Sequence, residues 1–255
     1  MPLEIATIPC LEHNYAFLLH DAQSGETAVV DVPEAETVSG ALKERGWSLS
    51  HILITHHHRD HSGGVVALHQ EHPSQIIGAS ADAHRLPDLH LAVSEGESFE
   101  IGGEQVQVLD VSGHTRGHIA FYFPDTGAVA SGDSLMALGC GRVYGDGPAQ
   151  MFESLQKIAE LPPETLVLSG HEFTEKNANF ALTLDPENEA LKRRAEAVRD
   201  LRGRGLPTIP SKLSDEYVTN PFLRCDDKSI QRAVGLEGAN LVDVFTEIRA
   251  RKNKF

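Results

Sequence analysis

The segment His56–His61 constrains the fold of this chain more strongly than any other part of its sequence. Its letters are HHHRDH, and it follows directly on an apolar run, His51–Thr55. Side chains two residues apart in an extended segment point to the same side. His56 and His58 can therefore bind one metal ion together. The segment predicts a strand that ends in a metal site.

The rest of this segment points to a second ion. Asp60 and His61 lie where the chain is expected to turn, so they can face a second metal. His57 lies between two predicted ligands and is expected to point away from both ions. His118 follows four residues after His114, and we expect it to support the structure or the ligands rather than to bind a metal.

Three other apolar runs end in a similar way. Residues 112–114 and 169–171 both read Ser-Gly-His, and residues 131–133 read Ser-Gly-Asp. Loops at strand ends are where functional sites are usually built. One zinc ion takes only three or four protein ligands, and imidazole and carboxylate ligands suit Zn, Fe and Mn. The set is too large for one ion and predicts two ions with a bridging carboxylate and a bridging water. The predicted ligands are His56, His58, Asp60, His61, His114, Asp133 and His171.

Short apolar runs broken by Gly, Asp, Ser and Asn predict strands over residues 1 to about 170. The predicted strands are Leu3–Ile8, Ala16–His20, Thr27–Val32, His51–Thr55, Gln75–Ala79, Gln105–Val111, Ala120–Phe123, Ala128–Ser131 and Thr165–Ser169. Helical spacing predicts helices between them at Glu34–Glu44, Gly64–Glu71 and Ala149–Glu160. Strands mixed with helices indicate a layered α/β architecture.

The composition changes after about residue 173. Asn177–Arg204 is rich in good helix formers. Gly205–Pro221 contains three prolines and is predicted to be an extended connection. Asn240–Lys252 is predicted to be a final amphipathic helix. The chain is therefore divided into an α/β domain, residues 1–172, and a small helical domain, residues 173–255.

Charge and cysteine content limit the kinds of partner and compartment. The 255 residues carry a formal net charge of −15, which argues against a nucleic-acid binder and against docking on an anionic membrane. The three cysteines are far apart and odd in number, so a disulfide framework is not expected. No signal peptide or membrane-spanning segment is recognised, and we expect a monomer in the cytoplasm that acts on a small molecule.

These residues also resemble a known family. Residues 55–61 look like the signature of the metallo-β-lactamase superfamily, which implies an αββα sandwich. The resemblance narrows to glyoxalase II, the hydroxyacylglutathione hydrolases, and covers essentially the whole chain. The similar segments include 113–118 (GHTRGH), 132–134 (GDS), 139–142 (GCGR), 170–174 (GHEFT) and, in the family's helical C-terminal domain, 220–224 (NPFLR) and 249–252 (RARK).

The resemblance assigns a role to each predicted ligand. It places His56, His58 and His114 at the first metal and Asp60, His61 and His171 at the second. Asp133 would bridge the two ions, and the carboxylates Asp60 and Asp133 would be the catalytic residues. Two divalent ions are implied, with zinc expected and iron or manganese as alternatives. A further hypothesis, from the residues themselves, is that Asp31, which follows an apolar run, supports the His-rich loop.

The resemblance also implies a substrate. Glutathione carries two carboxylates, and an acidic protein needs local cations to hold them. The implied substrate-binding residues are Phe173 and four contacts to the glutathione part, Arg142, Tyr144, Arg249 and Lys252. Phe173 stands where the family usually has Tyr, and Asn253 stands where it usually has Asp. Ser134 and Met136 replace a more usual Thr and Phe.

The implied reaction is hydrolysis of S-D-lactoylglutathione, or a related 2-hydroxyacylglutathione, by a metal-bridging hydroxide. Three alternatives stay open. A glutathione persulfide dioxygenase would use a single iron and would not need Asp60, His61 or His171. A lactonase or β-lactamase would not need residues 139–142 or the basic C-terminus. A non-catalytic metal-binding module would hydrolyse neither esters nor thioesters.

Overall fold

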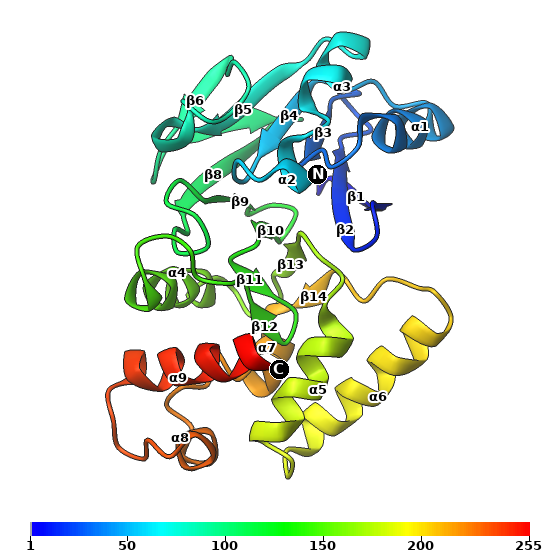
Figure 1. The fold of residues 1–255 in the computed structure, drawn as a ribbon. Helices are drawn as coiled ribbons and strands as arrows, with labels where there is room; N and C mark the ends of the chain where they lie inside the picture. Colours follow the sequence, from blue (N-terminus) through cyan, green and yellow to red (C-terminus); the bar gives the residue numbers. More distant parts are fainter. Residues whose placement is uncertain (1) are drawn as a thin grey trace.

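Two six-stranded sheets form the centre of the protein (Figure 1). The structure is a computed structural model that describes residues 2–255. The first sheet has the order β1-β2-β3-β4-β5-β6 and the second has the order β14-β13-β10-β9-β8-β7. The first contains Glu4–Cys10, Asn14–His20, Thr27–Val30, His51–Ile54, Gln75–Ala79 and Leu91–Val93, as β1 to β6. The second contains β7 (Ser98–Ile101), β8 (Glu104–Asp110), β9 (Ile119–Phe123), β10 (Ala128–Gly132), β13 (Leu166–Ser169) and β14 (Ser211–Lys212).

Helices cover the outer faces of both sheets. Figure 1 shows α1 and α3 with the first sheet, and α4 and the C-terminal helices with the second. The helices are α1 (Ala35–Arg45), α2 (Arg59–Ser62), α3 (Val65–Glu71), α4 (Pro148–Ala159), α5 (Thr174–Leu184), α6 (Glu189–Gly203), α7 (Leu213–Thr219), α8 (Lys228–Val234) and α9 (Leu241–Lys254). A 3-10 turn, η1 (Ser80–Asp82), and a hairpin of β11 (Leu135–Met136) and β12 (Gly139–Cys140) complete the chain.

The alternation of side chains along the strands explains the layers. Phe17 on β2 packs between the sheets with Phe121 on β9. The next residue along β2, Leu18, points to the opposite face and packs with Leu42 on α1. A third cluster lies between the second sheet and α4 and α9, and includes Leu155. Successive strand residues thus serve two different cores, and the predicted αββα sandwich is confirmed.

The prediction for the C-terminal part is wrong in one place. Gly205–Pro221 is not only an extended connection, because it contains β14 and α7. The helix formers of Asn177–Arg204 do form helices, namely most of α5 and all of α6, which are separated by residues 185–188. Asn188 begins α6, and its side chain accepts a hydrogen bond from the backbone N–H of Leu191 at 3.0 Å. An N-cap and a preceding proline outweigh the helix propensity of the flanking residues.

The two predicted domains share packing surfaces. Strand β14 lies in the C-terminal part but pairs with β13 of the second sheet. Phe245 on α9 packs in the same cluster as Val167 on β13. The boundary between residues 172 and 173 stays a prediction. None of the helices described here is both long enough and apolar enough to cross a membrane.

Candidate metal centre and substrate pocket

Four strand ends meet at one edge of the two sheets and carry all seven predicted metal ligands. β10 is parallel to β13 and antiparallel to β9, which is itself antiparallel to β8. β8, β10 and β13 therefore run in one direction and end at the same edge. β4 of the first sheet ends opposite them. The ligands are His56 and His58 after β4, Asp60 and His61 in α2, His114 after β8, Asp133 after β10 and His171 after β13.

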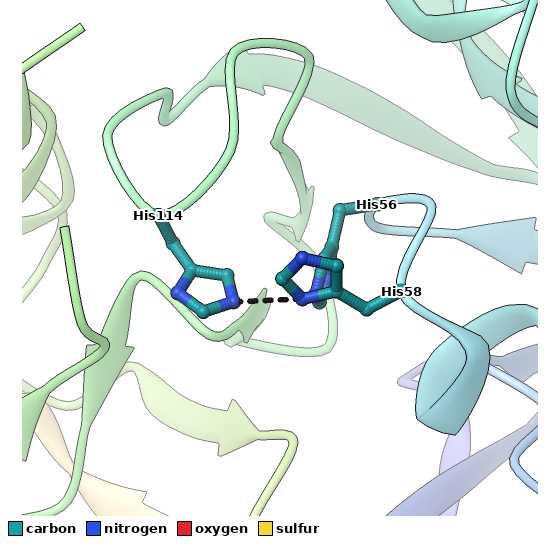
Figure 2. A group of neighbouring side chains, drawn as sticks. All are labelled: His56, His58 and His114. Atoms are coloured by element: carbon teal, nitrogen blue, oxygen red, sulfur yellow. Dashed lines mark hydrogen bonds between the residues drawn. The ribbon is translucent and has the colours of Figure 1, made fainter. Parts of the chain in front are cut away.

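The first ligand group consists of three imidazoles from two loops. Figure 2 shows His56 and His58 on one loop and His114 on another, with their rings turned toward one another. The distance between His56 Nε2 and His58 Nδ1 is 3.1 Å, and that between His58 Nδ1 and His114 Nε2 is 3.0 Å. His56 and His114 are buried, and His58 is half-buried.

The second group contains a carboxylate. His171 Nε2 lies 3.3 Å from His61 Nε2 and 3.3 Å from Asp60 Oδ2. His61 Nε2 lies 3.8 Å from the same carboxylate oxygen. The side chain of Asn14 donates hydrogen bonds to the backbone carbonyl of Asp60 at 2.9 Å and to its Oδ2 at 3.2 Å. Asp60 is therefore anchored from the first sheet.

Asp133 lies between the two groups. One of its carboxylate oxygens, Oδ1, is 3.3 Å from His61 Nε2. The other, Oδ2, is 3.4 Å from His114 Nε2 and 3.3 Å from His171 Nε2. His118 does not belong to any of the ligand groups but accepts the backbone N–H of Asp133 at 3.0 Å through Nε2. A carboxylate in this place can hold two ions at once.

Asp31 fixes the tautomers of two ligands. His61 Nδ1 donates to Asp31 Oδ2 at 2.7 Å. The hydroxyl of Thr55 donates to the same oxygen at 2.8 Å, so the Thr55 oxygen accepts from His56 Nδ1 at 3.0 Å. Both histidines thus direct Nε2 into the site. These contacts agree with the hypothesis that Asp31 supports the His-rich loop. Metal-binding histidines usually donate their second ring N–H to a carboxylate or another acceptor in this way.

A backbone carbonyl and a buried carboxylate orient two further rings. His114 Nδ1 is 2.8 Å from the carbonyl oxygen of Arg142. Because a carbonyl only accepts, Nδ1 carries the proton and Nε2 presents a lone pair to the site. His57 turns away from the ligands, and its Nδ1 lies 2.8 Å from Asp82 Oδ2.

The environment acts differently on the two groups. Burial lowers the pKa of His56 well below its usual value, lowers that of His114, and lowers that of His58 to about 4. Burial has the same effect on His61 and His171, but neighbouring carboxylates outweigh it. Asp133 and Asp31 raise the pKa of His61, and Asp133 with Asp60 raises that of His171 to about 9. The first group offers neutral lone pairs, while the second attracts positive charge.

These residues fit a metal centre by distance and by chemistry. In a tetrahedral zinc site with bonds of about 2.0–2.1 Å, neighbouring donor atoms are roughly 3.3–3.4 Å apart. The contacts around Asp133 are 3.3–3.4 Å. Asp133 Oδ1 is buried and has no hydrogen-bond partner among the described residues. Since a buried polar atom without a partner is costly, the site favours a cation at this place.

A pocket of about 410 Å³ adjoins the ligands. All five predicted substrate contacts line it, namely Arg142, Tyr144, Phe173, Arg249 and Lys252. The sequence interpretation missed two further lining residues, Lys176 and Asn177, both on α5. Their only sequence signal is that they follow Phe173 by one helical turn. Asn253 is exposed and does not line the pocket.

Arg249 and Lys252 are held in place by backbone oxygens. Arg249 is only 7% exposed, and its Nη1 donates to the Cys140 carbonyl at 2.8 Å. Lys252 Nζ donates to the Lys176 carbonyl at 2.9 Å and lies 5.1 Å from the ring centre of Phe180. Burial, with the nearby charges of Arg249 and Lys176, lowers the pKa of Lys252 to about 7. α9 therefore presents two fixed basic groups to the pocket.

Phe173 forms a wall of the pocket next to the metal centre. Its ring is stacked on that of His171, with 4.7 Å between ring centres and an interplanar angle of 6°. This contact limits the orientations open to His171. A phenylalanine here offers apolar surface but no hydroxyl donor to a bound molecule.

Comparison with known proteins identifies the family. Residues 13–171 match the sequence model of the metallo-β-lactamase superfamily, and residues 172–255 match that of the hydroxyacylglutathione hydrolase C-terminus. A curated protein from Ruegeria pomeroyi named hydroxyacylglutathione hydrolase is 57% identical over 255 residues, which is 100% of both chains. The chain belongs to the hydroxyacylglutathione hydrolase family. The resemblance noted in the sequence is thereby confirmed.

Solved structures of the superfamily share the fold. The BLEG-1 B3 metallo-β-lactamase superposes with a TM-score of 0.67 at 21% identity, over 86% of this chain and 99% of that one. TTHA1623, solved in a di-iron-bound form, gives a TM-score of 0.56 at 29% identity, over 66% of this chain and 91% of that one. The family model and the converging His and Asp groups together support divalent-metal binding by this member of the hydroxyacylglutathione hydrolase family.

Proposed function

We propose that the chain hydrolyses the thioester of 2-hydroxyacylglutathiones, S-D-lactoylglutathione in particular, to a 2-hydroxy acid and glutathione. The observation that carries this proposal is a pocket lined by four basic side chains, beside seven converging His and Asp side chains that could hold metal ions. The net charge of the chain is −15, so a basic pocket on this protein is selective for an anionic substrate. Full-length relatives named hydroxyacylglutathione hydrolase support the same reaction.

We further propose two divalent ions. His56, His58 and His114 would hold one, Asp60, His61 and His171 the other, and Asp133 both. Zinc suits the imidazole and carboxylate donors, with iron or manganese as alternatives, and TTHA1623 was solved in a di-iron-bound form. When bound, such ions lower the pKa of a bound water from 15.7 to about 7, supply hydroxide at neutral pH and polarise the thioester carbonyl.

The side chains of the protein then have positioning tasks. Asp60 and Asp133, the two predicted catalytic carboxylates, line the pocket and would fix the metal centre there. The basic groups hold the carboxylates of glutathione, so that the thioester lies near the centre. A thiolate leaves readily because its conjugate acid has a pKa of about 8.5, so no general acid is required. Burial raises the pKa of Cys140 to about 11, which makes that thiol unsuitable as a nucleophile.

Two smaller proposals concern the state of the protein. We propose a monomer in the cytoplasm with a small-molecule substrate and neither a nucleic-acid nor a membrane partner. The charge of −15 and three separate, buried, free cysteines support this.

The test is a thioesterase assay on purified protein with S-D-lactoylglutathione, together with metal analysis of the same sample. We expect release of free thiol and about two ions per chain, as seven ligands require. A variant that removes His171 is used below to separate the alternatives. Its matched control is His84→Gln, because His84 is exposed and does not line the pocket. No thiol release from a sample with two ions would refute the substrate but not the metal centre.

The same sample separates the alternatives. A persulfide dioxygenase would contain one iron, consume oxygen and tolerate loss of His171. A lactonase would hydrolyse lactones and be insensitive to Arg249→Ala. The second ligand group argues against a single iron, since the ligand atoms of Asp60, His61 and His171 also lie within 4.8 Å of one another.

A further inference from the structure

Four positive charges line the pocket without carboxylate partners. They belong to Arg142, Lys176, Arg249 and Lys252. Ion pairs occur nearby, for example between Arg251 and Glu247 on α9. Within residues 2–255, however, none of the four cations lies within ion-pair distance of an Asp or Glu. In a chain with 37 acidic residues, such a group of cations is suited to an anion from outside.

The position of Lys176 at the N-terminal end of a helix is electrostatically unfavourable for a cation. It lies in the first turn of α5, which begins at Thr174. The N-terminal end of a helix carries partial positive charge, so a lysine there is unfavourable. Lys252 is close as well, because its ammonium donates to the backbone carbonyl of Lys176. The charge of Lys176 contributes to the lowered pKa of Lys252.

The hydrogen-bonding capacity of the four cations differs. Arg249 Nη1 and Lys252 Nζ already donate to backbone carbonyls, and Arg142 Nη1 lies 3.4 Å from the Tyr144 hydroxyl. The Lys176 ammonium makes no hydrogen bond or ion pair with another residue in the range 2–255. It can therefore offer all three of its N–H groups to a ligand.

We infer that Lys176 is a specificity-determining residue, which binds a carboxylate of the glutathione moiety beside Lys252. The inference rests on the proposed function. A glutathione thioester carries two carboxylates, and each can accept hydrogen bonds from more than one cation. A carboxylate next to Lys176 and Lys252 relieves the repulsion between them. Lys176 lies one helical turn after Phe173, so it supplies a donor on the side of the pocket where the phenyl ring offers none.

The experiment measures binding of S-hexylglutathione, a thioether that the enzyme cannot hydrolyse, to the metal-loaded full chain by calorimetry. Lys176→Gln should weaken binding about threefold, the size expected for one exposed ion pair. Lys254→Gln removes the same charge from an exposed lysine near the end of α9 that does not line the pocket, and it should leave binding unchanged.

Two analogues then identify the carboxylate. One is S-hexylglutathione esterified at the glycine carboxylate, and the other is S-hexyl-cysteinylglycine, which lacks the γ-glutamyl group. Lys176→Gln should cause no further loss with the analogue that lacks the partner carboxylate, and should keep its effect with the other. Equal losses with both analogues, or wild-type affinity for S-hexylglutathione, would overturn the assignment of Lys176. If the wild-type chain neither binds S-hexylglutathione nor hydrolyses S-D-lactoylglutathione, the proposed function itself fails.

Discussion

The two halves of the metal centre are both arranged to hold a metal cation, but the protein shifts the pKa values of their histidines in opposite directions. His56, His58 and His114 are neutral, because burial lowers the pKa of each. His61 and His171 lie among carboxylates that raise their pKa. The three histidines of the first half offer a cation only neutral lone pairs, whereas the second half has a carboxylate of its own, Asp60. Among residues 2–255, two carboxylates connect the halves, Asp133 directly and Asp31 through hydrogen bonds.

The largest effect should come from removing the shared ligand. Asp133→Ala deletes a contact to His61, His114 and His171 at once. We expect kcat/KM for S-D-lactoylglutathione to fall at least about 1,000-fold, since several kcal/mol of charge stabilisation disappear. Metal content should fall in both halves. Retention of two tightly bound ions would contradict a bridging role.

A smaller effect on both halves is expected from Asp31. Its backbone has a positive φ of 56°, which Asn tolerates, so Asp31→Asn changes chemistry rather than backbone. An amide has only one oxygen. If that oxygen keeps the contacts of Oδ2 with His61 and Thr55, the NH2 group faces the backbone N–H of Thr55, which donates to Asp31 Oδ1 at 2.9 Å. Metal affinity should fall about 10- to 100-fold, as for other supporting residues of metal-binding histidines, measured by competition with a chelator.

Thr55→Val is the matched variant that separates the halves. It removes only the relay between Asp31 and His56. The affinity of the first ion should fall, while that of the second should stay. If Asp31→Asn and Thr55→Val weakened the same single ion, the idea that Asp31 supports both halves would be wrong.

A change confined to the second half is expected from Asn14→Leu. The variant removes two hydrogen bonds to Asp60 and keeps a side chain of similar size. We expect about tenfold weaker binding of one ion, in the range for supporting residues, and unchanged binding of the other. Chelator titration should then show two separate steps. Equal weakening of both ions would mean that Asn14 stabilises the whole edge and not Asp60 in particular.

The smallest effect concerns the pocket and leaves both halves intact. Lys252 has a pKa of about 7, lowered by burial and by Arg249 and Lys176. As pH rises through 7 the free enzyme loses this charge, so KM for the anionic substrate should increase several-fold while kcat changes little. Lys252→Met should have a high KM that is flat over the same pH range. A pH-dependent KM in that variant would assign the effect to another group.

The sequence predicted those parts of the site that are local in the chain. The HHHRDH run and the three Ser-Gly endings contain every ligand that the structure brings together. It did not reveal Asn14 as the anchor of Asp60, because the two residues are 46 positions apart and are joined only by tertiary contact. Lys176 was missed for a related reason, since a lysine in a helix-forming segment is normally a solvated residue.

The fold, like the site, was predicted where the signal is local in the sequence and missed where it depends on tertiary pairing. Wholly buried strands such as β3 and β9 were predicted because their apolar runs are continuous. Short strands were missed, and β14 has only two residues. Its place in the sheet depends on pairing with β13 and not on its own composition, since strand formation depends strongly on context.

That short strand has a consequence for solubility. β14 is the outermost strand of the second sheet, where Leu166 pairs with Lys212 and Val167 with Ser211. Without it, β13 would expose unpaired N–H and C=O groups along an apolar strand, which is a template for pairing with another molecule. The strand is two residues long and carries an exposed lysine, both of which discourage further pairing. The C-terminal part of the chain thus also protects β13, the strand that leads to His171, from pairing with another molecule and so from aggregation.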